Sequence, residues 1–227
     1  MSHQNVAGLY RQRRSGRWID RLYRLLRPPD LFLMNPDEQL PVPLGKHNLY
    51  VGGAGSLVPG FVNVDLVILP GVDVVGDVQR LPFRDGVFDR AECDAVLEHV
   101  PDPRQAVREI TRVLAPGGVV HIVTPFCHPF HEYPKDFWRF SLDGLRQLAG
   151  GLEELHAGWR TGPTATMLVF VLEYAKLLLP FRAWRILVHG VLGWMLFPLR
   201  YLDLVLLRYP RSDRIGNHCF LWLRKPG

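Results

Sequence analysis

The sequence predicts an α/β fold with a doubly wound, mainly parallel sheet and a helical apolar insert before the last strand. Three observations lead to this fold class. Short apolar or β-branched segments alternate with helical or turn segments between residues 47 and 163, which is typical of a parallel sheet with helices on its faces. The first strand candidate ends in the glycine cluster Gly52-Gly53-Ala54-Gly55. A long apolar stretch at residues 164–208 then precedes a closing segment, residues 209–227, that completes the sheet.

The composition fits one globular domain with a substantial core. The chain has 227 residues, of which 48% are hydrophobic. Its net charge of +5 is unevenly spread, because residues 1–27 carry seven arginines and one aspartate, whereas residues 28–180 carry more acidic than basic side chains. Basic segments thus flank an acidic middle, and we expect no nucleic-acid partner.

The cysteines and the first residues bear on the cellular compartment. Cys93, Cys127 and Cys219 lie far apart without CxxC spacing, so neither a disulfide framework nor a zinc finger is indicated. Residues 1–16 are polar and basic and lack the apolar stretch of a secretory signal. We therefore expect a cytoplasmic protein.

Residues 1–46 are predicted to hold a basic helix and a connector. Apolar residues recur at three- and four-residue spacing beside arginines: Trp18, Ile19, Leu22, Leu25 and Leu26. This is the pattern of an amphipathic helix, and Pro28-Pro29 ends it. The proline-containing stretch from there to Lys46 is typical of an irregular connector.

Residues 47–163 supply the alternating elements of the core. A helix over Pro103–Leu114 begins with proline and ends before Pro116-Gly117-Gly118, and Ser141–Ala149 forms a shorter helix. The predicted strands are Asn48–Val51, Phe61–Leu66, Val72–Val75, Val87–Cys93, Val119–Val123, Leu152–Trp159 and, after the insert, Ile215–Leu223.

The glycine cluster and two acidic residues indicate a nucleotide-like ligand. Glycines at a strand end let the backbone approach a ligand closely, and ligands of open parallel sheets bind beyond the carboxyl ends of the strands. Asp65 at the end of the second strand can accept hydrogen bonds from ribose hydroxyls. Asp77, after the third strand, can accept one from an adenine amino group.

The order and spacing of several short segments resemble the type 11 branch of the class I S-adenosylmethionine-dependent methyltransferases. The matching segments are Val51-Gly52-Gly53-Ala54-Gly55, Asn63-Val64-Asp65, Gly76 to Phe83, Phe88-Asp89, Val96-Leu97-Glu98-His99-Val100, Arg112 to Gly118, Pro125-Phe126 and His131 to Arg139. The resemblance covers about half of the chain. It implies a Rossmann-like methyltransferase fold with a seven-stranded sheet and S-adenosylmethionine as cofactor, S-adenosylhomocysteine being the product.

The resemblance also implies which residues bind the cofactor. The turn formed by Val51, Gly52, Gly53 and Ala54 would approach its methionyl part. Asp65 would bind the ribose, Asp77 and Val78 would flank the adenine, and Cys93 would contact the cofactor through its backbone.

Two departures from the family pattern concern the first strand and the segment after it. Tyr50 stands where an acidic residue is common. Only five residues separate Gly55 from Phe61, too few for a helical crossover, so the first helix must be missing or reduced to a turn. A noncatalytic cofactor- or membrane-binding scaffold of the same fold is therefore the alternative. A nicotinamide cofactor would also need glycines and an acid, but the missing helix and the Asp77 segment favour the methyl donor.

The family resemblance singles out a loop after the fifth strand as the acceptor side. We expect His131 to act as base or acceptor-orienting group, with Asp136 supporting it, and we include His99 among the candidates. The alternative is that His131 and Asp136 brace the loop, with Arg139 pairing to an acid. Histidines at 128 and 131 superficially suggest metal ligands, but their loop context makes this spacing nonspecific, and we expect no metal site.

The apolar insert is compatible with more than one kind of methyl acceptor and more than one kind of partner. Ile186–Leu199 is apolar except for His189, yet it is shorter than the roughly 20 residues of a membrane span. We favour a helical lid, which leaves a homodimer through the insert open. Peripheral contact with an anionic membrane surface is the alternative, because arginines accompany the apolar residues. The acceptor is then a small molecule or a lipid-linked one.

Overall fold

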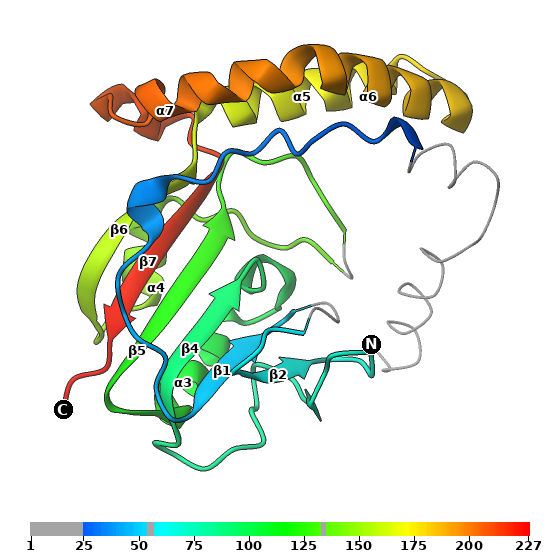
Figure 1. Cartoon of the computed structure of the whole chain (residues 1–227). Helices are drawn as coiled ribbons and strands as arrows, with labels where there is room; N and C mark the ends of the chain where they lie inside the picture. Colours follow the sequence, from blue (N-terminus) through cyan, green and yellow to red (C-terminus); the bar gives the residue numbers. More distant parts are fainter. Residues whose placement is uncertain (1–24, 54–56, 133–134) are drawn as a thin grey trace.

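The computed structural model describes residues 25–53, 57–132 and 135–227 (Figure 1). Its centre is a seven-stranded sheet in the order β3-β2-β1-β4-β5-β7-β6. Only β7 runs antiparallel to its neighbours, β5 and β6. The strands are β1 (Asn48–Val51), β2 (Val62–Asp65), β3 (Val74–Val75), β4 (Phe88–Asp94), β5 (Leu114–Pro125), β6 (Glu153–Thr161) and β7 (His218–Arg224). The predicted fold class, a mainly parallel sheet with an apolar helical insert before its last strand, is confirmed.

The helices fall into a group that follows the core strands and a group that forms the insert. The α-helices are α3 (Pro103–Val113), α4 (Leu142–Leu148), α5 (Pro163–Leu177), α6 (Arg182–Leu196) and α7 (Asp203–Leu206). The 3-10 helices are η1 (Pro36–Glu38), η2 (Leu97–His99), η3 (Phe197–Leu202) and η4 (Pro210–Arg214). Most of the predicted basic helix lies outside the described residues, as does Ala54.

Several predicted strand bounds differ from the structure, most of all those of β5. β5 begins at Leu114 rather than Val119, because Leu114 pairs with Phe88 directly after α3 ends. Gly117 and Gly118 extend this pairing through backbone hydrogen bonds with Lys225. β3 contains only Val74 and Val75, whose partners are the last two residues of β2.

One face of the sheet is covered by helices. Proline at the first position of α3 and the Asp102 side chain, which accepts a hydrogen bond from Gln105 N at 3.0 Å, start this helix where the sequence predicts it. The main core lies between α3, α4 and the strands, and its fully buried members include Ala91, Ala106, Ile110, Val120, Ile122, Leu145 and Leu221.

The other face is covered by the connector rather than by helices. Leu40 and Val42 pack on Val123, Phe220 and Trp222. Figure 1 shows this segment, drawn in blue, running along the sheet towards β1. Trp222 Nε1 donates to Glu38 O at 2.8 Å, which fixes η1 on β7.

Buried charged side chains also hold the connector on this face of the sheet. Glu38, 1% exposed, accepts a hydrogen bond of 2.6 Å from Arg160 Nε, and Arg160 Nη1 donates to Asp94 at 2.6 Å. His121 lies 3.2 Å from Glu38 and 2.8 Å from Glu92. Burial alone would lower the pKa of His121, but the two carboxylates outweigh it and raise that pKa. The connector is therefore held by ion pairs as well as by apolar packing.

The link between β1 and β2 is a turn. Residues 57–61 contain no helix, and Phe61 N donates to Val58 O at 3.3 Å. The Asn63 side chain bonds to the backbone of Val58 and Phe61, which holds the turn against β2. Within the described residues, the prediction that the first helix is missing or reduced to a turn is confirmed.

The insert forms a helical layer beyond the sheet. In Figure 1 the arrowheads of β4 and β5 point towards α5 and α6, which lie side by side. Leu31 of the connector packs with Leu168 and Leu172 in a small separate core beneath them. A Cβ on Gly193 would lie 2.4 Å from Pro28, so glycine allows the connector to cross α6 closely. No helix among the described residues is both long and apolar enough to cross a membrane.

Candidate active site

The strand order places the candidate site at the ends of β1 and β4. From β1 the chain proceeds to β2 and β3 on one side, and from β4 to β5 on the other, so the topological switch point lies between these two strands. In open α/β sheets, ligands bind at this point beyond the carboxyl ends of the strands. Val51 and Cys93 are paired here and are both buried.

The glycine turn after β1 has no room for a side chain. Gly52 has a φ of +75°, and a Cβ there would lie 2.2 Å from Val96 Cγ2. Its N–H donates to Val64 O at 2.8 Å, which ties the turn to β2. Glycine is therefore required at position 52 both by its backbone conformation and by the packing of Val96 against the turn. Next to this turn, burial and the carboxylates of Asp94 and Glu92 raise the pKa of Tyr50 to about 12, so the residue replacing the common acid is a neutral phenol.

The two predicted acids follow β2 and β3. Asp65 is the last residue of β2 and is 7% exposed, and its Oδ1 accepts a long 3.4 Å bond from Val67 N. Asp77 follows β3, where its Oδ1 accepts from Gln79 N at 2.8 Å and its two oxygens accept from Gln79 Nε2. Asp77 thus stabilises its own turn, a role that sequence reasoning did not assign to it.

The end of β4 contains a strained residue that sequence reasoning missed. Ala95 has a φ of +53°, a region that residues with a Cβ rarely adopt, and its N–H donates to Val123 O at 3.0 Å. Cys93, two residues before Ala95, is 0% exposed, and burial raises the pKa of its thiol. Val78 is buried with the core. No sequence signal marks Ala95, since the strain arises from the turn between β4 and η2.

The loop after β5 is docked on η2. Phe137 N donates to Glu98 O at 2.8 Å, and Trp138 Nε1 donates to Val100 O at 3.0 Å. Asp136 ties the loop together, because it accepts 2.8 Å and 2.6 Å hydrogen bonds from His131 N and Arg139 Nη2. Arg139 holds the pKa of Asp136 below its usual value, although burial alone would raise it. This arrangement matches the bracing role considered for Asp136 and Arg139.

Two candidate acceptor-side groups, His99 and His131, meet at Glu98. The Nε2 atoms of His99 and His131 each lie 3.7 Å from Glu98 Oε1, and the two imidazole rings are 5.0 Å apart between centroids. His131 Nδ1 lies 3.5 Å from Asp136 Oδ2. Interaction with Glu98 raises the pKa of His131, and Asp136 adds to this effect. His131 is 36% exposed in its side chain, so it is accessible to a small molecule. From the sequence we predicted that His99, His131 and Asp136 lie at the same edge of the sheet, but we did not predict a role for Glu98.

Two further histidines lie behind this cluster. The His128 ring is 5.0 Å from both His131 and His218 between centroids. Burial, followed by neighbouring cationic groups, lowers the pKa of His218 to about 3, and burial lowers that of His128. Asn217 Oδ1 lies 2.9 Å from His128 Nδ1. Both rings are therefore neutral at physiological pH and serve as packing for the loop.

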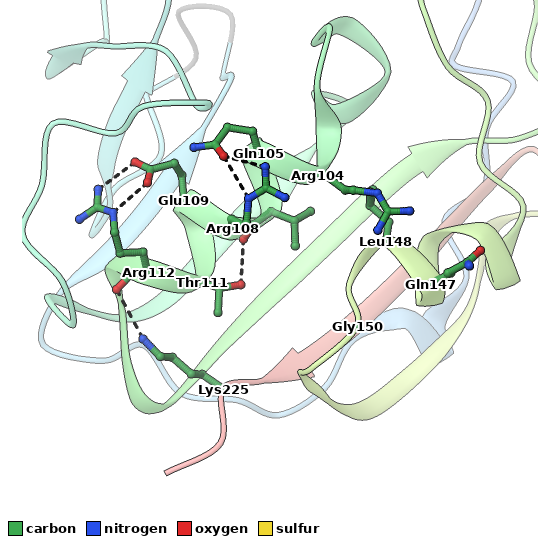
Figure 2. Close-up of a pocket in the computed structure, with 11 residues that line it drawn as sticks. Arg104, Gln105, Arg108, Glu109, Thr111, Arg112, Gln147, Leu148, Gly150 and Lys225 are labelled. Carbon is green, nitrogen blue, oxygen red and sulfur yellow. Dashed lines mark hydrogen bonds and ion pairs between the residues drawn. The ribbon is translucent and has the colours of Figure 1, made fainter.

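A hollow of about 640 Å³ lies away from the candidate site, on the outer side of α3 and α4. Figure 2 shows Arg108, Arg112 and Lys225 engaged with neighbouring groups. Arg112 pairs with Glu109 and Asp85, and Lys225 Nζ donates to Leu114 O at 2.6 Å. This hollow is remote from the carboxyl ends of β1 and β4, and we assign no chemistry to it.

Part of this chain is similar to known methyltransferases. Residues 61–122 match the family described as a methyltransferase domain. A 133-residue stretch is 34% identical to 2-methyl-6-phytyl-1,4-hydroquinone methyltransferase 1 of Oryza sativa subsp. japonica, covering 46% of this chain and 40% of that protein. The chain spans less than half the length of the curated relatives it matches.

Solved structures share the fold at low sequence identity. The [4+2]-cyclase SpnF superposes with a TM-score of 0.53 and 20% identity over 91% of this chain and 80% of the other. Phosphoethanolamine N-methyltransferase 2 of Haemonchus contortus, in complex with S-adenosyl-L-methionine, gives a TM-score of 0.52 and 18% identity over 93% and 53% of the two chains. These matches confirm the fold class predicted from the sequence.

Proposed function

We propose that this chain, which has the class I S-adenosylmethionine-dependent methyltransferase fold, transfers a methyl group from S-adenosylmethionine to an oxygen or nitrogen of a small or lipid-linked acceptor. The carrying observation is the glycine turn at the switch point of the sheet, with Asp65 at the end of the neighbouring strand. In this proposal Val51, Gly52, Gly53 and Ala54 line the methionyl part, and Asp65 binds the ribose. Asp77 and Val78 flank the adenine, and Cys93 contributes its backbone.

The proposed chemistry needs positioning more than covalent help from the protein. The acceptor atom attacks the methyl carbon in line, the carbon–sulfur bond breaks, and its electron pair stays on sulfur to give S-adenosylhomocysteine. Holding donor and acceptor in this geometry supplies much of the rate. An acceptor hydroxyl or ammonium must also lose a proton. We assign acceptor orientation or proton removal to His131, with His99 beside it and Asp136 fixing the loop.

The cofactor assignment is tested by calorimetric titration of the full chain. S-Adenosylmethionine and S-adenosylhomocysteine are both expected to bind, and Asp65→Ala is expected to weaken them about tenfold or more, because hydrogen bonds to a charged group contribute roughly 1.5–3 kcal/mol. Asp73→Ala is the matched control, since this exposed carboxylate bonds to Asn63 instead. Absence of binding by either compound at millimolar concentration contradicts the proposed function. Equal affinities of wild type and Asp65→Ala remove only the ribose assignment.

The role of His131 is tested by turnover. His131→Ala is expected to lower the rate of S-adenosylhomocysteine formation by about 100-fold or more, the usual contribution of a proton-transferring group, while cofactor affinity stays unchanged. A phytyl-bearing hydroquinone is a suitable first acceptor, because the relative with 34% identity is named for such a compound. Full activity of the variant would leave His131 as a loop brace. Cofactor binding without turnover on any acceptor would favour the noncatalytic scaffold.

The outward faces of the insert support a lipid-linked acceptor and contact with an anionic membrane. Exposed apolar residues recur at three- and four-residue spacing along both helices: Met167, Phe170, Val171, Tyr174, Leu177 and Leu178 on α5, and Trp184, Leu187, Val191, Trp194 and Met195 on α6. A soluble monomer rarely leaves so continuous an apolar surface in water. Arg182 and Arg185 lie at the start of α6 and are exposed, as are Arg208, Arg211 and Arg214 after α7.

A membrane accounts for this composition better than a second copy of the chain does. Aromatic and aliphatic residues flanked by arginines are typical of helices that lie in a bilayer interface. We therefore propose residues 164–208 as a membrane-facing lid above the core at 47–163, with residues 1–46 and 209–227 completing the domain. A homodimer through the insert is the competing outcome.

A further inference from the structure

Glu98 is a buried carboxylate that lacks a hydrogen-bond donor. It is 0% exposed, and neither of its oxygens accepts a hydrogen bond within the part of the chain that the structure describes. The backbone of η2 and the 2.8 Å bond from Phe137 N to Glu98 O hold the residue in place. A buried carboxylate is costly unless a cation or donors compensate its charge. The groups that face it therefore decide its role.

The nearest groups are ring nitrogens of two histidines. His99 Nδ1 lies 2.5 Å from Lys135 O, a carbonyl that can only accept, so this Nδ1 carries a proton. His131 Nδ1 lies 3.3 Å from Pro129 O and 3.4 Å from the donor Arg139 Nη2. With Nδ1 protonated, a neutral imidazole has a free lone pair on Nε2, and both Nε2 atoms lie 3.7 Å from Glu98 Oε1. The buried carboxylate therefore needs a positive charge at this point, either a proton on an Nε2 atom or a bound cation.

We propose that a divalent transition-metal ion binds between Glu98, His99 and His131. One ligand atom from each of these residues lies within 4.8 Å of the others. Two imidazoles and one carboxylate form the donor set of catalytic zinc sites, which keep a further position open. Ligating histidines also donate their other ring N–H to a carbonyl or carboxylate, and Lys135 O and Pro129 O lie where they can accept from the two Nδ1 atoms. This proposal departs from the sequence-based expectation of no metal site, which was argued from the 128–131 spacing, whereas this group joins η2 to the loop after β5.

The role of the ion in catalysis rests on the proposed function, whereas the binding of the ion to these residues does not. A metal ion beside the methyl acceptor would orient an acceptor hydroxyl or amine and make its proton easier to lose. His131 would then act as a ligand that positions the acceptor rather than as the group that removes the proton. Asp136 would orient His131 from behind, since its Oδ2 accepts from His131 N at 2.8 Å.

Titration with Zn²⁺ in the absence of S-adenosylmethionine tests this site. The full chain, first treated with chelator, is expected to bind one Zn²⁺, and His131→Ala and His99→Ala are each expected to weaken that binding at least tenfold. His47→Ala is the matched control, because His47 is exposed and bonds through its backbone to Asp89. Glu98→Gln keeps the side-chain shape while removing the charge, and it should weaken Zn²⁺ binding similarly. Circular dichroism confirms that each variant is folded.

Two results would overturn the metal site. One is the absence of Zn²⁺ binding at millimolar concentration, which would mean that protonated imidazoles compensate Glu98 instead. The other is Zn²⁺ binding that folded His131→Ala, His99→Ala and Glu98→Gln retain at wild-type affinity, which would place the ion elsewhere. Replacing Zn²⁺ with Co²⁺ gives an independent readout, since visible absorption bands typical of nitrogen ligation should appear in wild type and vanish in His131→Ala. Because no methyl donor is present, a negative result leaves the cofactor titration and the proposed methyl transfer untouched.

Discussion

Vesicles containing anionic lipid are expected to sediment the full chain at low salt and to leave the triple variant Phe181→Ser, Trp184→Ser and Trp194→Ser in solution. These side chains are 65%, 55% and 53% exposed. Fully burying a large apolar side chain contributes roughly 1.5–3 kcal/mol, so half-exposed residues contribute about 1 kcal/mol each on entering the interface. Their joint loss corresponds to on the order of a hundredfold in partitioning.

Charge and oligomeric state provide the controls for this experiment. Arg182→Gln with Arg185→Gln should weaken sedimentation on anionic vesicles, since each basic residue near such a surface contributes about 1 kcal/mol. The same pair should matter little on neutral vesicles. A variant in the hollow on α3, Arg104→Gln, removes a charge far from the insert and should bind as wild type does. Wild-type chain that stays in solution with vesicles but elutes as a dimer, with the triple variant monomeric, would replace the membrane by a second copy.

Replacing Arg160 with alanine is expected to lower the free energy of unfolding by about 3–5 kcal/mol. Its guanidinium joins Glu38 on the connector to Asp94 at the end of β4, and its side chain is only 13% exposed. Removing it leaves Glu38 buried with only the partly compensating imidazole of His121, 3.2 Å away. This loss would be a large share of the roughly 5–15 kcal/mol typical of domains. Chemical denaturation monitored by tryptophan fluorescence measures it, because Trp222 contacts the same cluster.

A surface ion pair on the same sheet gives the comparison. Arg224 Nη1 lies 3.6 Å from Glu153 Oε2, and both side chains are about half exposed. Arg224→Ala should therefore cost less than about 1 kcal/mol. If the two variants lose the same free energy, the buried charges do not hold the connector, and apolar packing by Leu40 and Val42 must account for its position.

The core of the fold could be predicted because its signals are local. Helix α3 carries its own start in Asp102 and Pro103, and the alternation of apolar segments marks the strands. The missing helix between β1 and β2 follows from the number of residues available. The predicted strand bounds were less accurate where pairing with a distant segment sets the end of a strand. The strand β5 extends back to Leu114 because Phe88 and Lys225 pair with its first residues.

The second face of the sheet could not be predicted, because its closure depends on distant residues. Glu38, Glu92 and Arg160 resemble solvated charges in the sequence, and nothing local shows that they become buried together. The connector therefore resembled a plain linker.

The candidate site was predictable in position but not in detail. Parallel strands end at one edge, so the segments carrying Asp65, His99 and His131 were expected to converge there. The sequence did not reveal that Glu98 loses all contact with solvent, because its burial depends on the loop that docks through Phe137 and Trp138. The hydrogen bond that engages Asp77 with Gln79 was likewise hidden, since it depends on the turn geometry.

The closure of the sheet by η1 has a consequence for how the chain acquires its structure during synthesis. The indole of Trp222 donates to Glu38 O across 184 positions of sequence. Until β7 has left the ribosome, residues 36–42 lack Phe220 and Trp222, which form much of the apolar surface on which they pack. Long-range pairing of this kind slows folding and prolongs exposure of unpaired segments. We therefore expect the nascent chain to depend on chaperones until its last strand is made, even though most of its core residues have emerged long before.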